Sequence, residues 1–255
     1  MEILYITGAG VSKDSGIPTF RGTDGIWTIG SINYTPQEMA TREMYENNPA
    51  QFLLWYFKRF AKYRSATPNA VHKWLSSKNL ITQNIDGLDG KAGNSTYIPI
   101  HGRLDKVTKY VEQGVITPEI DAPWDYIASL GFDNEENYED ERSLVEALLK
   151  SFKIKKRKDG KYLPEINGSL KPFVLLFDEF YTDLYRINEA HRKMLLADKI
   201  VFMGTSFSVN ITSMALEIAV SKGIDVEIVD PEPIEITYKN TSYFEMSAVE
   251  YIETL

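Results

Sequence analysis

Short apolar runs that end in turns constrain the fold of this chain more than any other feature of its sequence. The first run, Ile3-Leu4-Tyr5-Ile6, stops at Gly8-Ala9-Gly10. Runs of this length are typical of parallel strands that are buried on both faces. Because helical stretches separate them, they predict an α/β fold: a Rossmann-like open parallel sheet with helices on both faces, whose ligands bind beyond the carboxyl ends of the strands. The other runs occupy residues 80–82, 173–177, 200–203 and 226–229.

Helical patterns fill the stretches between these runs. Asn48-Pro49 fits the cap and first position of a helix, and aromatic residues follow at positions 52, 56, 60 and 63 with helical spacing, so we expect them in the core. Residues 153–162 alternate basic and apolar residues around Asp159-Gly160, which predicts a hairpin with a two-residue turn and a solvated basic face. Further helices are expected over residues 141–152, 183–197 and 213–222.

The composition narrows the function classes. The 255 residues carry a net charge of −8, which argues against a nucleic-acid partner because phosphate binding needs a basic surface. No stretch of about 18 apolar residues exists and the chain starts with a strand-like segment, so we expect no membrane partner and a cytoplasmic location. The absence of cysteine excludes disulfides, a thiolate nucleophile and any Cys-ligated zinc.

The glycine turn after the first strand suggests a dinucleotide site when it is taken alone. Glycine lets the backbone approach a pyrophosphate, which a following helix N-terminus attracts. However, Lys13 stands at the third glycine of the usual fingerprint, and no acidic residue lies in a clear second strand about 20 positions further on. A hydride-transferring Rossmann dehydrogenase therefore fits poorly.

A longer series of motifs resembles the sirtuin family over residues 3–102 and 171–230. Residues 8–22, GAGVSKDSGIPTFRG, are similar to the signature of that family almost position by position. The other motifs that carry the resemblance are Gly25-Ile26-Trp27, Pro68-Asn69-Ala70-Val71-His72, Thr82-Gln83-Asn84-Ile85-Asp86-Gly87-Leu88 with Ala92-Gly93, His101-Gly102, Phe177-Asp178-Glu179, and Gly204-Thr205-Ser206 with Val209.

The resemblance implies two domains and one missing feature. Residues 1–30, 65–103 and 171–255 are expected to form a Rossmann-like NAD-binding domain, and residues 31–64 and 104–170 a smaller helical and hairpin domain made of insertions. Most sirtuins carry a four-cysteine zinc module after the catalytic His-Gly, whereas Lys109 and Glu112 stand where ligands are expected here. No zinc is therefore expected, and the helix over 141–152 with the following hairpin is expected to supply another core.

The residue types also suit an enzyme that breaks the bond between nicotinamide and ribose. Backbone N–H groups of Gly8-Ala9-Gly10, the Ser206 hydroxyl and the Arg21 cation are candidates for binding the pyrophosphate of NAD. Asn84 and Asp86 follow a buried strand and are placed to bind the carboxamide and ribose hydroxyls, although Asn-x-Asp also fits a turn cap.

The histidines receive different interpretations. His101 has an ordinary pKa of roughly 6.5, so its neutral imidazole is available as a base near neutral pH, and the order of the motifs assigns it to catalysis. His72 is read as a structural residue at a helix start, and His191, on a charged helix, as a surface residue.

The resemblance extends the site. It implies that Asn84 acts with His101, that Gln83 contacts the ribose, that Ile17 lies near the nicotinamide and that Phe20 covers the reactive carbon. Further cofactor-binding residues implied by the family are Ser12, Gly204, Thr205 and Asp230. The channel for an acylated lysine in a peptide or protein is expected to be lined by Phe177, Glu179 and Val209.

The implied activity is NAD-dependent protein-lysine deacylation, which yields nicotinamide, free lysine and O-acyl-ADP-ribose. Thr19, Asp178 and Asp230 depart from residues common in the family, and Asp178 bears on peptide binding because it replaces a loop glycine. Two alternatives remain open: an NAD glycohydrolase or ADP-ribosyltransferase without an acyl-lysine substrate, and a non-catalytic NAD-binding module.

Overall fold

The computed structural model describes residues 1–18, 27–132 and 141–255. The chain forms two compact units. Unit 1 comprises Met1–Phe20, Ala66–His101 and Tyr185–Leu255, and unit 2 comprises Arg21–Ser65 and Gly102–Leu184. The boundaries differ from those expected from the sequence: residues 21–30, 65, 102–103 and 171–184, which were assigned to the NAD-binding domain, fall in unit 2.

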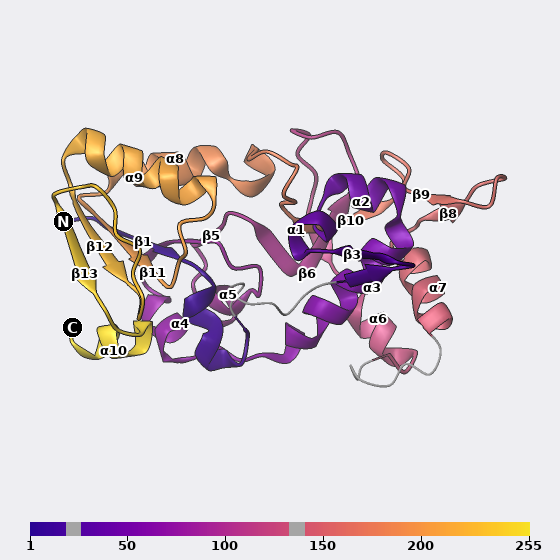
Figure 1. Cartoon of the computed structure of the whole chain (residues 1–255), viewed down its shortest axis with the longest axis horizontal. Coiled ribbons are helices and arrows are strands. Elements are labelled where there is room, and N and C mark those ends of the chain that lie inside the picture. The colour runs from indigo at the N-terminus through magenta and orange to yellow at the C-terminus, as the bar shows by residue number, and fades with distance from the viewer. Residues whose placement is uncertain (19–26, 133–140) are drawn as a thin grey trace. The chain divides into compact units, whose positions relative to one another are not determined.

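A six-stranded parallel sheet forms the centre of unit 1, in the order β13-β12-β11-β1-β4-β5. Helices α8 and α9 lie on one side of this sheet and α4 and α10 on the other (Figure 1). The predicted Rossmann-like architecture is therefore confirmed. The strands are β1 (Ile3–Thr7), β4 (Asn79–Thr82), β5 (Ile98–Pro99), β11 (Lys199–Met203), β12 (Asp225–Val229) and β13 (Thr241–Phe244).

The central strands β1 and β11 are mostly apolar because both of their faces are covered. Leu4 and Ile6 of β1 are fully buried, and one core cluster joins Tyr5 to Leu75 of α4 and Tyr251 of α10. The helices and short 3-10 turns of unit 1 are η1 (Ala9–Ser15), α4 (Ala70–Leu75), α5 (Leu88–Lys91), η3 (Asp183–Tyr185, partly in unit 2), α8 (Ile187–Leu196), α9 (Asn210–Lys222) and α10 (Ala248–Glu253).

Strand β1 marks the point where the order of the sheet reverses. The chain adds β4 and β5 on one side of β1, and later adds β11, β12 and β13 on the other. In open parallel sheets such a switch point leaves a crevice at the carboxyl ends of the central strands, which is the usual place for a ligand.

Two predicted helices differ in their bounds. The helix expected over residues 183–197 is broken at Arg186, whose φ of 59° leaves a 3-10 turn before it and α8 after it. The helix expected from residue 213 begins at Asn210 as α9 and ends, as expected, at Gly223 with a left-handed φ of 68°. Helix boundaries are less well defined by sequence than helix existence.

Unit 2 contains a three-stranded antiparallel sheet in the order β10-β6-β7. The run over residues 173–177 was expected to belong to the parallel sheet, and this prediction is wrong because its first residues lie in β10. Every residue of β10 is buried, and its last two residues, Phe173 and Val174, begin an apolar run that looks like a parallel strand in sequence. The strands of unit 2 are β2 (Trp27–Ile29), β3 (Ile32–Tyr34), β6 (Gly102–Lys109), β7 (Ile120–Asp121), β8 (Lys155–Lys156), β9 (Tyr162–Leu163) and β10 (Leu170–Val174).

An aromatic cluster forms the core of unit 2. Phe52 and Tyr56 of α3 stack with ring centroids 6.1 Å apart, and Trp124 lies 6.1 Å from Tyr56 and 5.9 Å from Phe152. Phe52, Tyr56 and Phe152 are at most 1% exposed. The helices of this unit are α1 (Pro36–Met39), α2 (Arg42–Asn47), α3 (Pro49–Phe60), η2 (Ala61–Ser65), α6 (Trp124–Ser129) and α7 (Glu141–Ser151).

The core expected from the helix over 141–152 is thus present, with α7 packed beside α3. The hairpin that follows differs from the prediction. Strands β8 and β9 are joined by residues 157–161 rather than by a two-residue turn, and Arg157 N–H donates to the Lys161 carbonyl oxygen. The side chain of Phe60 lies outside the described part of the chain.

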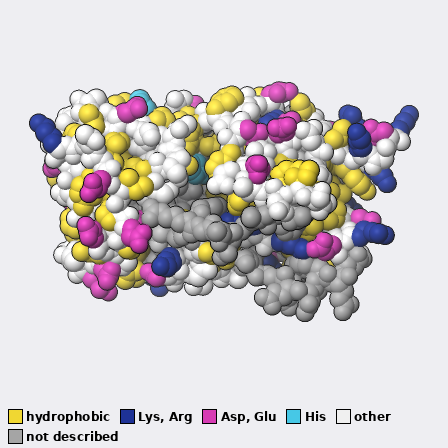
Figure 2. All heavy atoms as spheres, viewed as in Figure 1, with side chains coloured by type: hydrophobic (Ala, Val, Ile, Leu, Met, Phe, Trp, Pro, Cys, Tyr) yellow, Lys and Arg dark blue, Asp and Glu magenta, His cyan; other side chains and the backbone are white. Residues whose placement is uncertain are grey.

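Two general features concern the surface and the lengths of the helices. Acidic and basic side chains are interspersed over the face that Figure 2 shows. Within residues 1–18, 27–132 and 141–255, every helix is too short or too polar to span a bilayer.

Candidate active site

Polar residues gather at the carboxyl ends of four neighbouring strands of unit 1. Gly8-Ala9-Gly10 follows β1, Gln83 follows β4, Gly204 follows β11 and Asp230 follows β12. These strands are adjacent in the sheet, and they flank the switch point at β1. The fold therefore brings together motifs that lie up to about 220 positions apart in the sequence at the edge where such sheets bind ligands.

Glycines allow the turns after β1 and β11 to touch. A Cβ on Gly10 would lie 2.6 Å from the Gly204 Cα, and a Cβ on Gly8 would lie 2.7 Å from the Gly204 carbonyl oxygen. The Gly8 N–H donates to the Met203 carbonyl oxygen at 3.0 Å, and the Gly10 N–H donates to the Gly204 carbonyl oxygen at 2.9 Å. The prediction that these two N–H groups face a phosphate is wrong, because both are used to join the turns. Of the three turn residues, Ala9 keeps that expected role.

Ser12 connects the β1 turn to the loop after β4. Its hydroxyl donates to Asp86 Oδ2 at 2.6 Å and accepts from Asn84 Nδ2 at 3.1 Å. Asn84 Nδ2 also donates to the Gly8 carbonyl oxygen at 3.0 Å. Ser12 is 1% exposed, so these bonds are shielded from water and fix the loop firmly.

Asp86 both caps a turn and keeps carboxylate acceptor capacity for a ligand, which are the two roles that its motif allowed. Its Oδ1 accepts from the Leu88 N–H at 2.9 Å, which is the turn cap, while its Oδ2 accepts from Ser12. A carboxylate oxygen has further lone pairs, so these bonds leave acceptor capacity for a ligand. The cap holds the carboxylate in place.

His72 has the structural role at a helix start that the sequence predicted, and it also packs against Ser12. It starts α4 with Asn69 as its cap, as expected, but it is fully buried and its Nε2 lies 3.4 Å from Ser12 Oγ. Burial lowers the pKa of His72, against the opposing effect of the nearby Asp86 carboxylate. Its spacing showed only the helix start, because the contact with Ser12 joins segments 60 positions apart. His191 is exposed, as predicted.

His101 lies just after β5, and its Nδ1 is 3.0 Å from the Gln83 carbonyl oxygen. A carbonyl oxygen can only accept, so Nδ1 carries a hydrogen and the lone pair of the neutral ring is on Nε2. Burial lowers the pKa of His101 to about 4, against the smaller raising effect of the Gln83 hydrogen bond. The ring is therefore a neutral base near neutral pH, held next to the loop that carries Asn84.

The remaining predicted cofactor residues of unit 1 lie around the same edge. Gln83 Nε2 donates to Thr205 Oγ1 at 3.1 Å, and the Ser206 and Ser208 hydroxyls are 2.7 Å apart at the surface. Asp230 is buried and accepts from the Glu232 N–H at 3.0 Å. Ile17 is partly exposed at the end of the β1 turn.

A second buried carboxyl group lies under the loop and was not predicted from the sequence. Asp89 of α5 is 2% exposed, and its Oδ1 has no hydrogen-bond partner within the described ranges. Burial first, and then the neighbouring Asp86 carboxylate, raise the pKa of Asp89 to about 7, while a hydrogen bond with the Thr82 hydroxyl opposes the shift. No residue pattern could reveal this group, since its effect depends on burial.

Several predictions lie outside the described residues. These are the roles of Phe20 and Arg21, the Thr19 substitution and the Gly25-Ile26 part of the second motif.

The residues expected to bind the substrate divide between the units. Val209 of unit 1 is partly exposed at the start of α9. In unit 2 the side chain of Phe177 is 59% exposed, whereas the Glu179 side chain is only 6% exposed and both of its oxygens are engaged by cations. The predicted role of Glu179 at the peptide channel therefore falls on a side chain whose two oxygens are already paired.

A zinc module does not fit this chain. Lys109 and Glu112, which stand at two expected ligand positions, are exposed, and a lysine ammonium offers no lone pair to a metal. Across the part of the chain that the structure describes, no group of three or more His, Cys, Asp or Glu side chains is arranged to hold a metal ion.

Comparisons with known proteins agree with this geometry. The family model described as "Sir2 family" matches residues 8–211. The chain is 31% identical over 258 aligned residues to "NAD-dependent protein deacylase 1" of Caldanaerobacter subterraneus subsp. tengcongensis, covering 97% of this chain and 90% of that protein.

Solved structures of Sir2 homologues share the fold. A Sir2 homologue in complex with NAD aligns with a TM-score of 0.70 and 26% identity, covering 99% of this chain and 87% of the other. A mutant Sir2 homologue in complex with 2'-O-acetyl ADP ribose aligns with a TM-score of 0.71 and 26% identity, covering 99% of this chain and 89% of the other.

Proposed function

The chain belongs to the Sir2 family, and from this premise we infer that it is an NAD-dependent protein-lysine deacylase. The observation that carries the inference is the placement of His101. Its Nδ1 donates to the Gln83 carbonyl oxygen, which puts the lone pair of the neutral ring on Nε2, and Gln83 directly precedes Asn84 of the Ser12–Asn84–Asp86 network. A non-catalytic module has no need of a histidine tuned in this way.

The residues present fit NAD. Bound NAD supplies a ribose carbon from which nicotinamide can leave. The Ser206 hydroxyl and the Ala9 backbone lie at the switch point, where phosphates bind in open sheets. Asn84 and Asp86 present amide and carboxylate oxygens that suit a carboxamide and ribose hydroxyls. Asp230, after β12, has acceptor capacity for the second ribose.

The described residues have distinct tasks in this proposal. Nε2 of His101 accepts the proton of a ribose hydroxyl, while the Nδ1–H bond to Gln83 keeps the ring oriented. Ser12 holds Asp86 and Asn84 in a single arrangement, so that less order must be imposed when NAD binds. His72 and Asn69 hold Ser12 in place from α4.

The finer parts of the proposal concern the partners. Relatives named as protein deacylases support an acylated lysine in a protein or peptide as the co-substrate. The cysteine-free sequence and the poor fit of Lys109 support function without zinc. A cytoplasmic location and the absence of nucleic-acid or membrane partners remain predictions from composition.

One experiment tests the reaction and the acyl choice together. The protein is incubated with NAD and a panel of acyl-lysine peptides, and both nicotinamide and acyl-ADP-ribose are measured. We expect both products to appear only when an acylated peptide is present. Nicotinamide release at an equal rate without peptide would instead favour the glycohydrolase alternative, and NAD binding without any turnover would favour a binding module.

Replacement of His101 tests the base. The His101→Ala variant should bind NAD within a few-fold of the wild-type affinity in calorimetry and lose deacylation. His191→Ala, which removes an exposed histidine of α8, is the control and should keep both. Deacylation by His101→Ala at the wild-type rate would refute the assignment.

A further inference from the structure

The loop over residues 176–180, here called the substrate loop, is closed upon itself. The Glu179 N–H donates to the Leu176 carbonyl oxygen at 3.0 Å, and Glu179 Oε2 accepts from the Leu176 N–H at 3.0 Å. The side chains of Phe177 and Phe180 are each 59% exposed. The loop therefore turns the Glu179 side chain inward and presents aromatic side chains to the outside.

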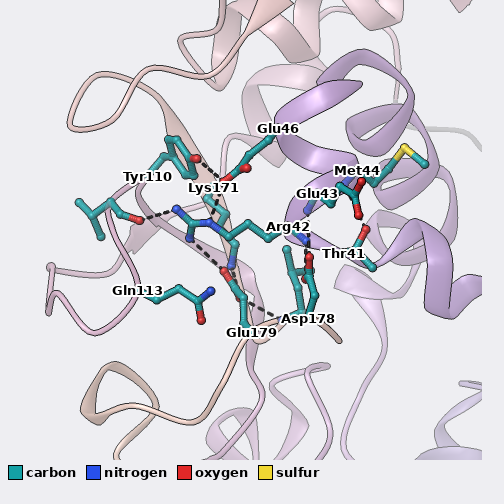
Figure 3. Close-up of polar contacts among 12 residues, drawn as sticks. Thr41, Arg42, Glu43, Met44, Glu46, Tyr110, Gln113, Lys171, Asp178 and Glu179 are labelled. Atoms are coloured by element: carbon teal, nitrogen blue, oxygen red, sulfur yellow. Dashed lines mark hydrogen bonds and ion pairs between the residues drawn. The ribbon is translucent and has the colours of Figure 1, made fainter.

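Asp178 attaches this loop to the start of α2. Its Oδ1 accepts from the Arg42 N–H at 2.6 Å and its Oδ2 accepts from the Glu43 N–H at 3.0 Å (Figure 3). The first N–H groups of a helix have no partner inside the helix and favour a negative charge, so a carboxylate suits this place. The Phe177 N–H also donates to the Ala40 carbonyl oxygen at 2.9 Å. A glycine at position 178 could make neither of the two side-chain bonds.

Glu179 attaches the same loop to a buried ion cluster. Its Oε1 lies 3.2 Å from Arg42 Nη1 and its Oε2 lies 2.9 Å from Lys171 Nζ, which also donates to the Val174 carbonyl oxygen. Lys171 and Glu179 have side-chain exposures of 7% and 6%. Removing one partner from such a buried pair leaves an uncompensated charge, so the arrangement is fixed.

Arg42 extends this cluster to the segment after β6. Its Nη2 donates to the Val111 carbonyl oxygen at 2.8 Å, its Nε pairs with Glu46 Oε1 at 2.8 Å, and its guanidinium lies over the Tyr110 ring at 4.6 Å from the centroid. Gln113 Oε1 of the same segment accepts from the Phe180 N–H at 3.1 Å. Figure 3 shows Arg42 at the centre of these contacts.

We propose that Arg42 and Asp178 are positioning residues for substrate recognition, which set the affinity for the acyl-lysine peptide by holding the substrate loop without touching the peptide. Glu179 is a third positioning residue, because it holds the same loop through Arg42 and Lys171. The inference rests on the proposed deacylase function, since the resemblance to the family implies that the loop with Phe177 and Glu179 borders the acyl-lysine peptide. The Arg42 side chain connects α2, the segment 110–113 and the substrate loop. These side-chain contacts include the segment in which most relatives are expected to carry metal ligands.

The test separates peptide affinity from turnover. Asp178→Ala and Arg42→Met should each raise the KM for an acyl-lysine peptide at least tenfold, while the KM for NAD and the kcat stay within about twofold. Asp178→Asn keeps one acceptor oxygen and Arg42→Lys keeps the charge without the planar fork, so both should show a smaller rise. This graded rescue is not expected from a general loss of stability.

A control removes an arginine that also pairs with a glutamate but is more exposed, with side-chain exposures of 39% for Arg186 and 12% for Arg42. Arg186 pairs with Glu189 at 2.8 Å and donates to the Tyr97 carbonyl oxygen within unit 1. Arg186→Met should therefore leave the peptide KM unchanged, whatever its effect on the unfolding midpoint.

The possible outcomes of these measurements either support or overturn the positioning role of Arg42 and Asp178. A peptide KM within twofold of wild type in folded Asp178→Ala overturns the inference and leaves the deacylase function intact. Equal losses of kcat and peptide affinity with a lowered unfolding midpoint also overturn it. Should Arg42→Met fail to fold, Asp178→Asn decides, because it only exchanges one oxygen of an exposed loop for an NH₂ group. Absence of deacylation by the wild type overturns the proposed function and the inference together.

Discussion

His101 shows how one backbone contact fixes the chemistry of a side chain. The Gln83 carbonyl oxygen selects the tautomer, and burial keeps the ring neutral with a pKa of about 4. Both effects come from β4 and β5 lying side by side, which places residues 83 and 101 within hydrogen-bond distance.

The pH dependence of deacylation follows from this pKa. The base acts in its neutral form, and the neutral fraction falls as the pH drops through the pKa. We therefore expect the acid limb of kcat/KM to lie about two pH units below the value of roughly 6.5 of an ordinary histidine. The profile is measured with circular dichroism at each pH to confirm that the protein stays folded. An acid limb near 6.5 would contradict the burial of the base.

Gly204 is a residue at which a single methyl group should be harmful. Its φ of 60° is left-handed, and a Cβ would lie 2.7 Å from the Val11 nitrogen. Gly223 has a similar φ of 68° but open space around it. Gly204→Ala should therefore lower the free energy of unfolding by about 1–3 kcal/mol more than Gly223→Ala, and should also weaken NAD binding. If both variants lost the same free energy of unfolding in urea, the left-handed backbone conformation alone, and not the close contact with Val11, would explain the loss.

At the scale of elements, α5 carries a carboxyl group whose protonated form is favoured in the folded chain. Asp89 has a pKa of about 7 in the folded chain and roughly 3.9 when unfolded. Because the folded value is the higher one, its favourable contribution is present below the unfolded pKa and is lost as the pH rises from about 4 to about 7.

Replacing Asp89 by asparagine should remove this pH dependence. The wild type should lose stability relative to Asp89→Asn across that interval, as measured by urea unfolding at several pH values. A difference between the two proteins that does not change with pH would show that Asp89 is not protonated in the folded state.

The helices α3, α6 and α7 depend on one another through the aromatic cluster. Phe152 follows α7, is fully buried and contacts Trp124. Phe152→Ala should lower the free energy of unfolding by about 3–5 kcal/mol, because it leaves a cavity in this core. Tyr126→Ala, at a side chain of α6 that is 45% exposed, should change it by less than about 0.5 kcal/mol. Similar losses for both variants would show that the cluster is not the core of unit 2.

At the scale of the whole molecule, the poor fit of Lys109 and Glu112 to a zinc module leads to a simple expectation, since the described residues include no group arranged to hold a metal ion. Incubation with a chelator should change neither the unfolding midpoint nor the deacylation rate, since the aromatic cluster and the Arg42 contacts hold unit 2 together. A cysteine-containing relative treated in parallel should lose stability. A fall in both quantities for this chain would reveal a metal bound by other ligands.

The sequence by itself determined the parallel α/β sheet, the glycine turn and the family, and it singled out His101 as the candidate base, because apolar runs and motifs are local in the chain and each depends on a few neighbouring residues. It assigned β10 to the wrong sheet, since burial on both faces looks the same in either kind of sheet. Only the tertiary structure decided that the Gly10 N–H serves the Gly204 carbonyl oxygen, that His72 meets Ser12 and that Asp178 binds the start of α2. The physical reason is that each of these contacts joins segments at least 60 positions apart, so its distance, its burial and the resulting pKa exist only after the chain has folded.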